Sequence, residues 1–281
     1  ILPEVLPQDR LSWGNGILEL LTFLGIILGT LCGGLLAAGF KEKPAFSGVL
    51  LATLAGVGYL CSRGIPAVPA ANPACPLRIN PLTDLWRQTV AMLPDRDLWR
   101  ANLGNTGFFF IAALVQMNLV LFAHEILHLN ETQNASLNAA LAIGIGLGSV
   151  CAGYASRGRI EYRLVPAGAF LMGLSTLPMG WQGIGTGLFS VALVFLGFGG
   201  GLFIVPITAV LQHRPAPENK GAVQGAASVL SFLGILAASG VQKALRMVLG
   251  APQIFWFCGG VAVLVGAYVF FSRRDQMRLG R

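Results

Sequence analysis

Long apolar segments constrain this chain more than any other feature of its sequence. Eight of them, each of about 20 residues, are long enough to cross the hydrocarbon core of a bilayer as a helix. They run over residues 16–39, 46–64, 103–123, 137–155, 164–179, 184–211, 222–245 and 253–271. Since 54% of the 281 residues are hydrophobic and only 11% are charged, the composition also departs far from that of soluble proteins. The chain therefore belongs in a membrane.

The same segments decide between the two architectures that can span a membrane. None of them alternates apolar and polar residues with a period of two, as the strands of a membrane barrel do. Backbone groups in lipid must be hydrogen-bonded within their own helix or within a closed barrel, so a bundle of helices remains. We predict an all-α membrane protein.

The Lys and Arg residues are distributed unevenly among the connections. If the stretch before the first segment is cytoplasmic, all but four of the 19 Lys and Arg residues lie on that side. The four exceptions are Lys41, Lys43, Lys243 and Arg246. Because basic loops stay on the cytoplasmic side, this distribution predicts the topology. It also accounts for the net charge of +7, so we expect no nucleic-acid partner.

The longest connection divides the chain into parts. Residues 65–102 are rich in Pro and Arg, and they separate two apolar segments in residues 1–64 from six in residues 103–272. We predict that they form a cytoplasmic linker between two bundles, and that residues 273–281 form a basic cytoplasmic tail. Within the linker, LTDLWRQTVAMLPDRDLWR has apolar residues at helical spacing. This pattern favours a helix at the membrane surface over a loosely ordered loop.

One short pattern points to a different chemistry. On a helix, His124-Glu125-x-x-His128 is typical of a zinc protease, because residues four apart share a face and can bind one metal ion. Such a site needs three protein ligands, and the third histidine, His213, lies in a loop predicted on the opposite side of the membrane. The five cysteines are single and form no CxxC spacing. We therefore expect no metal and no cofactor, and a polar cluster around Glu125 at the outer surface.

Four stretches carry a family resemblance. They are LPEVLPQDRLSWGNGILELLTFLGIILGTLCGG, QMNLVLFAHEILHLNETQ, AALAIGIGLGSVCAG and GFGGGLFIVPITAVLQHRPAPENKGAV. In them the chain resembles transporters of the major facilitator superfamily, and more narrowly the lysophospholipid transporter family. That family includes the transporter domain fused to bacterial acyl-carrier-protein synthetase and 2-acylglycerophosphoethanolamine acyltransferase domains. The resemblance implies twelve helices in two six-helix halves, of which this chain would be a fragment that supplies helices five to twelve.

The resemblance also implies a transporter rather than an enzyme. Its substrate would be a lysophospholipid, chiefly lysophosphatidylethanolamine, flipped across the bacterial inner membrane by alternating access between the two halves. The implied partners are this substrate, the membrane lipids and an acyltransferase, either fused or separate. Two alternatives stay open, namely a superfamily carrier for another small solute and the transporter part of a bifunctional phospholipid acyltransferase.

Polar residues inside the apolar segments are the candidate substrate contacts, because they are costly in lipid unless they face the bundle interior or a wet cavity. The candidates inside the segments are Gln116, Asn118, Glu19 and Asn138, and Glu125, just beyond the outer end of the third segment, is added to them. Gln116 and Asn118 point roughly 200° apart around their helix, so at most one of them faces a cavity squarely, and we favour Gln116. In the alternative interpretation, these side chains bond to a neighbouring helix and only stabilise the bundle.

Two places depart from the pattern of the resembling family. Its members commonly have asparagines near the start of the seventh segment, where this chain has Ala227, Ser228 and Ser231. They also tend to have a lysine at the position of His124, followed by the shared Glu125. If the asparagines contact substrate in those relatives, that contact is altered here.

Overall fold

The computed structural model describes residues 6–7, 10–40, 44–65, 80–156, 159–181 and 183–279. Within these ranges all the regular elements are helical, which confirms the predicted fold class. They are α2 (Leu11–Gly39), α3 (Pro44–Ser62), α4 (Pro81–Met92), α5 (Arg96–Glu125), α6 (Glu131–Ala155), α7 (Leu164–Met179), α8 (Thr186–His213), η2 (Pro217–Asn219), α9 (Lys220–Arg246) and α10 (Ala251–Leu279).

Each predicted apolar segment corresponds to one of these helices. Among the described residues, six helices are long and apolar enough to cross a membrane, namely α3, α5, α6, α8, α9 and α10. Helix α7 and the Leu11–Ile26 part of α2 are shorter apolar helices. The chain is thus built as a multi-pass membrane protein.

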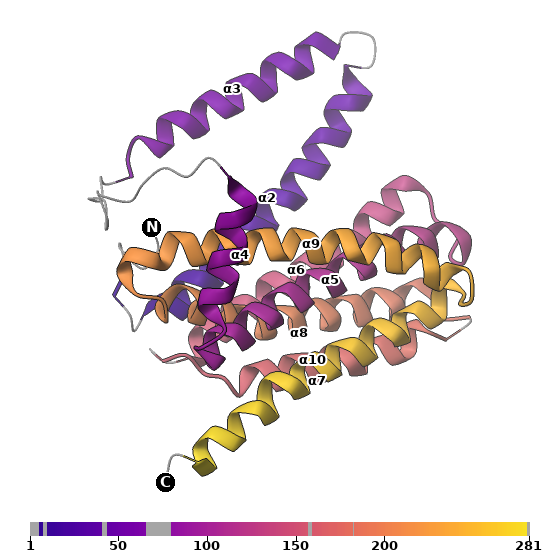
Figure 1. Cartoon of the computed structure of the whole chain (residues 1–281). Helices are drawn as coiled ribbons and strands as arrows, with labels where there is room; N and C mark the ends of the chain where they lie inside the picture. The colour runs from indigo at the N-terminus through magenta and orange to yellow at the C-terminus, as the bar shows by residue number, and fades with distance from the viewer. Residues whose placement is uncertain are drawn as a thin grey trace.

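Helix α8 is the core of a bundle formed by α5 to α10 (Figure 1). It packs against α6 and α7 most extensively and also contacts α5 and α2. At one end of the bundle, rings from three helices form a cluster: Phe122 of α5, Phe189 of α8 and Phe255 of α10, with centroids 4.6 to 5.6 Å apart. A helix that is apolar on all sides is expected in such a buried position.

Glycines allow α6 and α8 to lie in close contact. A Cβ atom added at Gly144 or Gly148 would lie less than 3.0 Å from the backbone of α8. One added at Gly201 would come equally close to the backbone of α6. In lipid there is little hydrophobic drive between helices, so close van der Waals packing of this kind holds them together.

Helix α2 joins this bundle only through its first turns. There it packs on α6, where a Cβ atom at Gly16 would lie 2.5 Å from the carbonyl oxygen of Ser149. The rest of α2 leads away from the bundle to α3 (Figure 1). None of the apolar stretch Ala45–Ser62 of α3 is buried. The surface of α3 is therefore available to lipid or to other helices.

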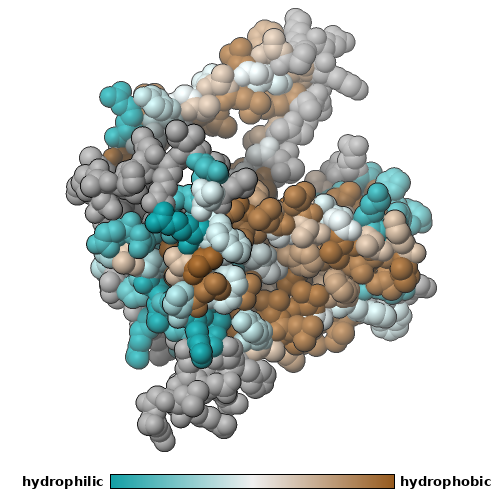
Figure 2. All heavy atoms as spheres, in the orientation of Figure 1, coloured by the Kyte–Doolittle hydropathy of each residue, from teal (hydrophilic) through white to brown (hydrophobic). Residues whose placement is uncertain are grey.

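Polar side chains gather towards the two ends of the bundle, with an apolar belt between them (Figure 2). The connections α5–α6, α7–α8 and α9–α10 lie together at one end, whereas α4 and the α8–α9 connection lie at the other (Figure 1). This is the arrangement that a bundle crossing a bilayer requires. By the predicted topology, the end with α4 faces the cytoplasm, and we call the opposite end the outer end.

Some helix ends differ from the predicted segment ends. Helix α5 begins at Arg96 rather than at residue 103, because Asp95 caps it, so the last part of the predicted linker is helical. Helix α10 continues to Leu279, through most of the predicted tail. The stretch predicted as one helix, residues 82–100, is divided between α4 and the start of α5, with a break at residues 93–95. Helix α4 contacts α9, and Trp86 on it is exposed. Residues 66–79 of the linker lie outside the described residues.

Candidate functional site

A cavity of about 320 Å³ lies between α2, α5, α8 and α9. We call it the Glu19 cavity, after the residue that α2 contributes. The other residues on its wall are Asn105, Phe109, Ile204, Thr208, Gln224, Ser228, Ser231, Phe232 and Ile235. The wall thus combines one carboxylate, two amides and three hydroxyls with phenyl rings and aliphatic chains. Such a lining can bind an amphiphile, with its polar part on the hydrogen-bonding groups and its apolar part on the rings.

Glu19 gives this cavity its charge. Among the described residues that line the cavity, no other is charged. A carboxylate held away from bulk water favours a positively charged or hydrogen-bond-donating partner. The arrangement is therefore suited to an ammonium group or to a proton.

The polar side of the cavity is held in place by bonds between helices. The side-chain nitrogen of Asn105 donates to the hydroxyl of Ser231 over 2.8 Å, and this hydroxyl donates to the carbonyl of Ala227 over 2.9 Å. The first of these bonds joins α5 to α9, and the second lies within α9. Ser231 and the exposed Ser228 both lie on the wall.

A pair of amides connects α2 to α8 one helical turn from Glu19. Asn15 and Gln212 each donate to the side-chain oxygen of the other over 2.9 Å. Asn15 is buried, so this reciprocal pair satisfies groups that would otherwise be costly in an apolar bundle. It is the main polar contact that we find between α2 and the helices of the bundle.

Two of the predicted residues, Gln116 and Asn138, are brought together. The side-chain nitrogen of Gln116 on α5 donates to the side-chain oxygen of Asn138 on α6. Gln116 lies on the same face of α5 as Asn105 and Phe109, and roughly 16 Å beyond Asn105 along the helix axis. The polar pair therefore continues, towards the outer end, the face that lines the Glu19 cavity.

Asn118 lies elsewhere, as its position on the helix predicts. It is fully buried, and its side-chain nitrogen donates to the carbonyl of Ala251 over 2.8 Å. Its side-chain oxygen accepts from Gln242 over 3.4 Å. These contacts join α5, α9 and α10, which favours the interpretation in which Asn118 stabilises the bundle.

Glu125, the last residue of α5, forms an ion pair at the outer end. Both of its carboxylate oxygens accept from one terminal nitrogen of Arg246, over 2.7 and 2.9 Å. Arg246 is the last residue of α9, so the pair ties two helix ends together. It is separate from the Glu19 cavity.

The helix that a zinc protease motif needs ends inside the motif. Helix α5 stops at Glu125, and His128 has a backbone φ of 51°, in the left-handed region. His124 and His128 therefore do not share a helical face. Among the described residues, no group of three His, Cys, Asp or Glu side chains is placed to hold a metal ion.

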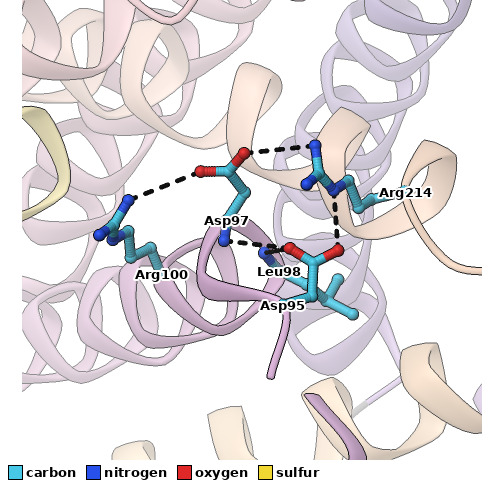
Figure 3. A network of polar contacts seen from close by, with 5 residues as sticks. All are labelled: Asp95, Asp97, Leu98, Arg100 and Arg214. Atoms are coloured by element: carbon cyan, nitrogen blue, oxygen red, sulfur yellow. Dashed lines mark hydrogen bonds and ion pairs between the residues drawn. The ribbon is translucent and has the colours of Figure 1, made fainter. Parts of the chain in front are cut away.

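A network of charges joins α5 to α8 at the end with α4 (Figure 3). One oxygen of Asp95 accepts from the backbone N–H groups of Asp97 and Leu98, and the other accepts from the Nε of Arg214 over 2.8 Å. Arg214 also contacts Asp97 over 3.2 Å, and Asp97 contacts Arg100. Each carboxylate is thus held between cationic or N–H partners.

The network shifts the proton affinities of its members. Partial burial tends to raise the pKa of Asp95, but its hydrogen bonds to Arg214 and to the backbone outweigh this, so the pKa lies below its ordinary value. The hydrogen bond that Arg214 donates to Asp95 raises the pKa of Arg214. Both groups therefore stay charged at neutral pH.

Several wall residues were not predicted from the sequence. Asn105, Thr208 and Gln224 lie near the ends of their apolar segments, where polar residues are ordinary. Nothing in the spacing within a single helix distinguishes them. Only the contact between four helices, which a pattern in one segment does not encode, brings them to Glu19.

Comparison with known proteins places this arrangement among transporters. The family model described as Major Facilitator Superfamily matches residues 1–239 and, in a second overlapping match, residues 119–279. The chain is 30% identical to a lysophospholipid transporter LplT of Klebsiella pneumoniae subsp. pneumoniae, over 98% of this chain and 69% of the relative. Lysophospholipid transporters LplT of Cronobacter sakazakii and Salmonella newport are 32% and 29% identical, over 76% and 95% of this chain and 53% and 62% of the relatives.

Proposed function

This chain belongs to the Major Facilitator Superfamily, and from that premise we propose that it moves lysophospholipid, chiefly lysophosphatidylethanolamine, across the bacterial inner membrane. The relatives that match it over most of its length are named as lysophospholipid transporters. The observation that carries the proposal is the Glu19 cavity, because its single carboxylate suits the ammonium of an ethanolamine headgroup. Its phenyl and aliphatic walls suit the apolar part of the same molecule.

The mechanism we propose is alternating access between two halves of a twelve-helix carrier, of which this chain supplies helices five to twelve. Helices α2 and α3 would belong to the first half and α5 to α10 to the second. Support comes from α3, whose apolar surface is unburied and so is available to further helices. The Glu19 cavity would then lie between the halves, with α2 on one side and α5, α8 and α9 on the other.

The direction we propose is from the outer to the inner leaflet, where an acyltransferase, fused or separate, restores the second acyl chain. In that scheme the headgroup meets Glu19 and the neighbouring hydroxyls. The Asn15–Gln212 pair, one turn away, is a contact between the halves that has to break when they separate. No bond of the substrate is made or broken by this chain.

The test is uptake and reacylation of labelled lysophosphatidylethanolamine in spheroplasts that lack their own carrier. Expression of the gene that encodes this chain should restore both. Glu19→Gln should lower the initial rate by about tenfold, since it removes the charge that pairs with the ammonium. Glu218→Gln, at an exposed carboxylate of η2, is the matched control and should leave the rate unchanged. No restoration by the wild type, despite normal membrane insertion, would refute the proposal.

A further inference from the structure

A second pocket, of about 580 Å³, lies at the outer end of the bundle and shares no lining residue with the Glu19 cavity. It is formed where α5 and α9 end, where α10 begins and where the α7–α8 connection passes. Its lining residues are Glu125, Ile126, Gly183, Arg246, Gly250, Ala251, Pro252 and Gln253. We call it the outer pocket.

The outer pocket presents two opposite charges side by side. The side chains of Glu125 and Arg246 are 39% and 31% exposed, and the contact uses a single nitrogen of the guanidinium. An ion pair this open to water contributes little net stability, because water competes for both partners. A ligand that carries an anion next to a cation can therefore take the place of this contact and bind both side chains.

Further groups on the wall suit the same two charges. The side-chain oxygen of Gln253 is buried and, among the described residues, has no hydrogen-bond partner. An ammonium group beside Glu125 could donate to it. The wall also includes the first turn of α10, where the backbone N–H groups of Ala251 and Gln253 have no acceptor within the helix and favour an anion.

Exposed apolar side chains lie close in the sequence to residues of the pocket wall, and we call them the rim of the outer pocket. Met247 and Val248 follow Arg246 directly and are 76% and 84% exposed, and Trp181, next but one to Gly183, is 68% exposed. Ile126 on the wall adds a further aliphatic group. Exposed apolar and indole side chains at the end of a membrane bundle are typical of contact with lipid at the interface. The surroundings thus favour an amphiphile over a free water-soluble ion.

We propose that the outer pocket captures the zwitterionic headgroup of a single-chain lipid before it reaches the Glu19 cavity. The phosphate binds Arg246 and the ammonium binds Glu125, while the acyl chain lies over the apolar rim. This inference rests on the proposed function for its place in transport, but the binding itself is testable alone.

The binding test uses the full-length protein in nanodiscs, with Glu19→Gln as a background that removes the charge of the other cavity. The probes are lysophosphatidylethanolamine, lysophosphatidic acid, which lacks the ammonium, and glycerophosphoethanolamine, which lacks the acyl chain. Glu125→Gln should weaken binding of the first by about tenfold and leave that of the second unchanged, whereas Arg246→Gln should weaken both. Lys243→Gln, in the same last turn of α9, is the control.

A misfolded variant would lose both lipids alike, so the selective loss identifies the pocket. Equal weakening of both lipids by Glu125→Gln, or no weakening by either variant, would overturn the inference. If glycerophosphoethanolamine binds as tightly as the lipid, the ligand is a soluble phosphodiester and the assignment to a lipid is wrong.

Transport rates separate this inference from the proposed function. In spheroplasts, Glu125→Gln and Arg246→Gln should raise the half-saturating lipid concentration by about tenfold and leave the maximal rate nearly unchanged. If the wild type transports lipid and neither variant changes this concentration, the outer pocket is not a capture site while the proposed function stands. If the wild type does not transport lipid, the proposed function fails, and the binding pattern still decides the inference.

Discussion

Gln116 and Asn118 are two residues apart on α5, and the structure gives them different surroundings. Gln116 is exposed and bonds to Asn138, while Asn118 is buried and bonds to α9 and α10. We expect Asn118→Ala to lower the free energy of unfolding by roughly 1 kcal/mol, because it leaves the Ala251 carbonyl and Gln242 without a partner. Denaturant titration of the purified protein measures this loss.

Gln116→Ala is the matched variant and should show the opposite pattern. It should leave the free energy of unfolding within about 0.5 kcal/mol, because its side chain is exposed, on the surface that we propose faces the transport path. Its initial rate of lipid uptake should fall instead. A stability loss at Gln116 equal to that at Asn118 would contradict these roles.

Asp95 supports a prediction about pH. The pKa of Asp95 is lower in the folded protein than its ordinary value of 3.8. The charged carboxylate therefore stabilises the fold fully when the pH is above 3.8, and this stabilisation is lost as the pH falls through the pKa of the folded state. Asp95→Asn removes the charge but keeps a capping side chain, and should cost about 0.2–1 kcal/mol at neutral pH. Asp95→Ala removes the cap as well, and should cost about 0.5–2 kcal/mol.

The midpoint of thermal unfolding of the wild type and both variants, measured from neutral pH downwards, checks these predictions. The difference between wild type and Asp95→Asn should stay constant down to about pH 5 and should vanish at lower pH. A difference that grows on acidification would mean that the pKa of Asp95 is raised rather than lowered.

Some residues of the candidate site were predictable from the sequence, and others were not. Glu19 and Gln116 were predicted because a polar side chain inside an apolar segment is conspicuous. The 200° angle between Gln116 and Asn118 also predicted that they would separate. The role of Asn118 as a bond to the Ala251 carbonyl was not predictable, because a helix start elsewhere in the chain supplies the acceptor.

At the scale of the helices, the close packing of α6 on α8 makes a strong prediction. Gly201→Ala would place a methyl group less than 3.0 Å from the α6 backbone and should destabilise the protein by about 1–3 kcal/mol. Gly225→Ala, on an exposed face of α9 with nothing within 4 Å, should be neutral or slightly stabilising. Equal effects of the two substitutions on the unfolding midpoint would show that the close contact is absent.

The helices themselves were predictable because each must satisfy its own backbone in lipid. All eight apolar segments are helical, and α7 has the predicted bounds. A helix was predicted over residues 82–100, but not its break at residues 93–95, where Asp95 caps a new helix that continues into the apolar segment. The His124–His128 pattern was misleading because a zinc protease motif requires a helix through both histidines, whereas α5 ends at Glu125.

At the scale of the whole molecule, polar groups lie at three levels along the bundle. The outer pocket lies at the outer end, the Gln116–Asn138 pair lies below it on α5 and α6, and the Glu19 cavity lies beyond. The apolar composition predicted a membrane protein but not these positions. They depend on which helices are neighbours, and the contacts of α2 with α6 and α8 are encoded by no single segment.

The central claim is that this protein moves a single-chain phospholipid between leaflets. The most direct measurement reconstitutes the full-length protein into liposomes and follows fluorescent lysophosphatidylethanolamine with albumin, which extracts lipid only from the outer leaflet. The account predicts that the protein makes a growing fraction of the lipid resistant to extraction, and that Glu19→Gln slows this by about tenfold. The central claim would be contradicted if lipid became resistant to extraction at the same rate in protein-free liposomes, with the wild type and with Glu19→Gln.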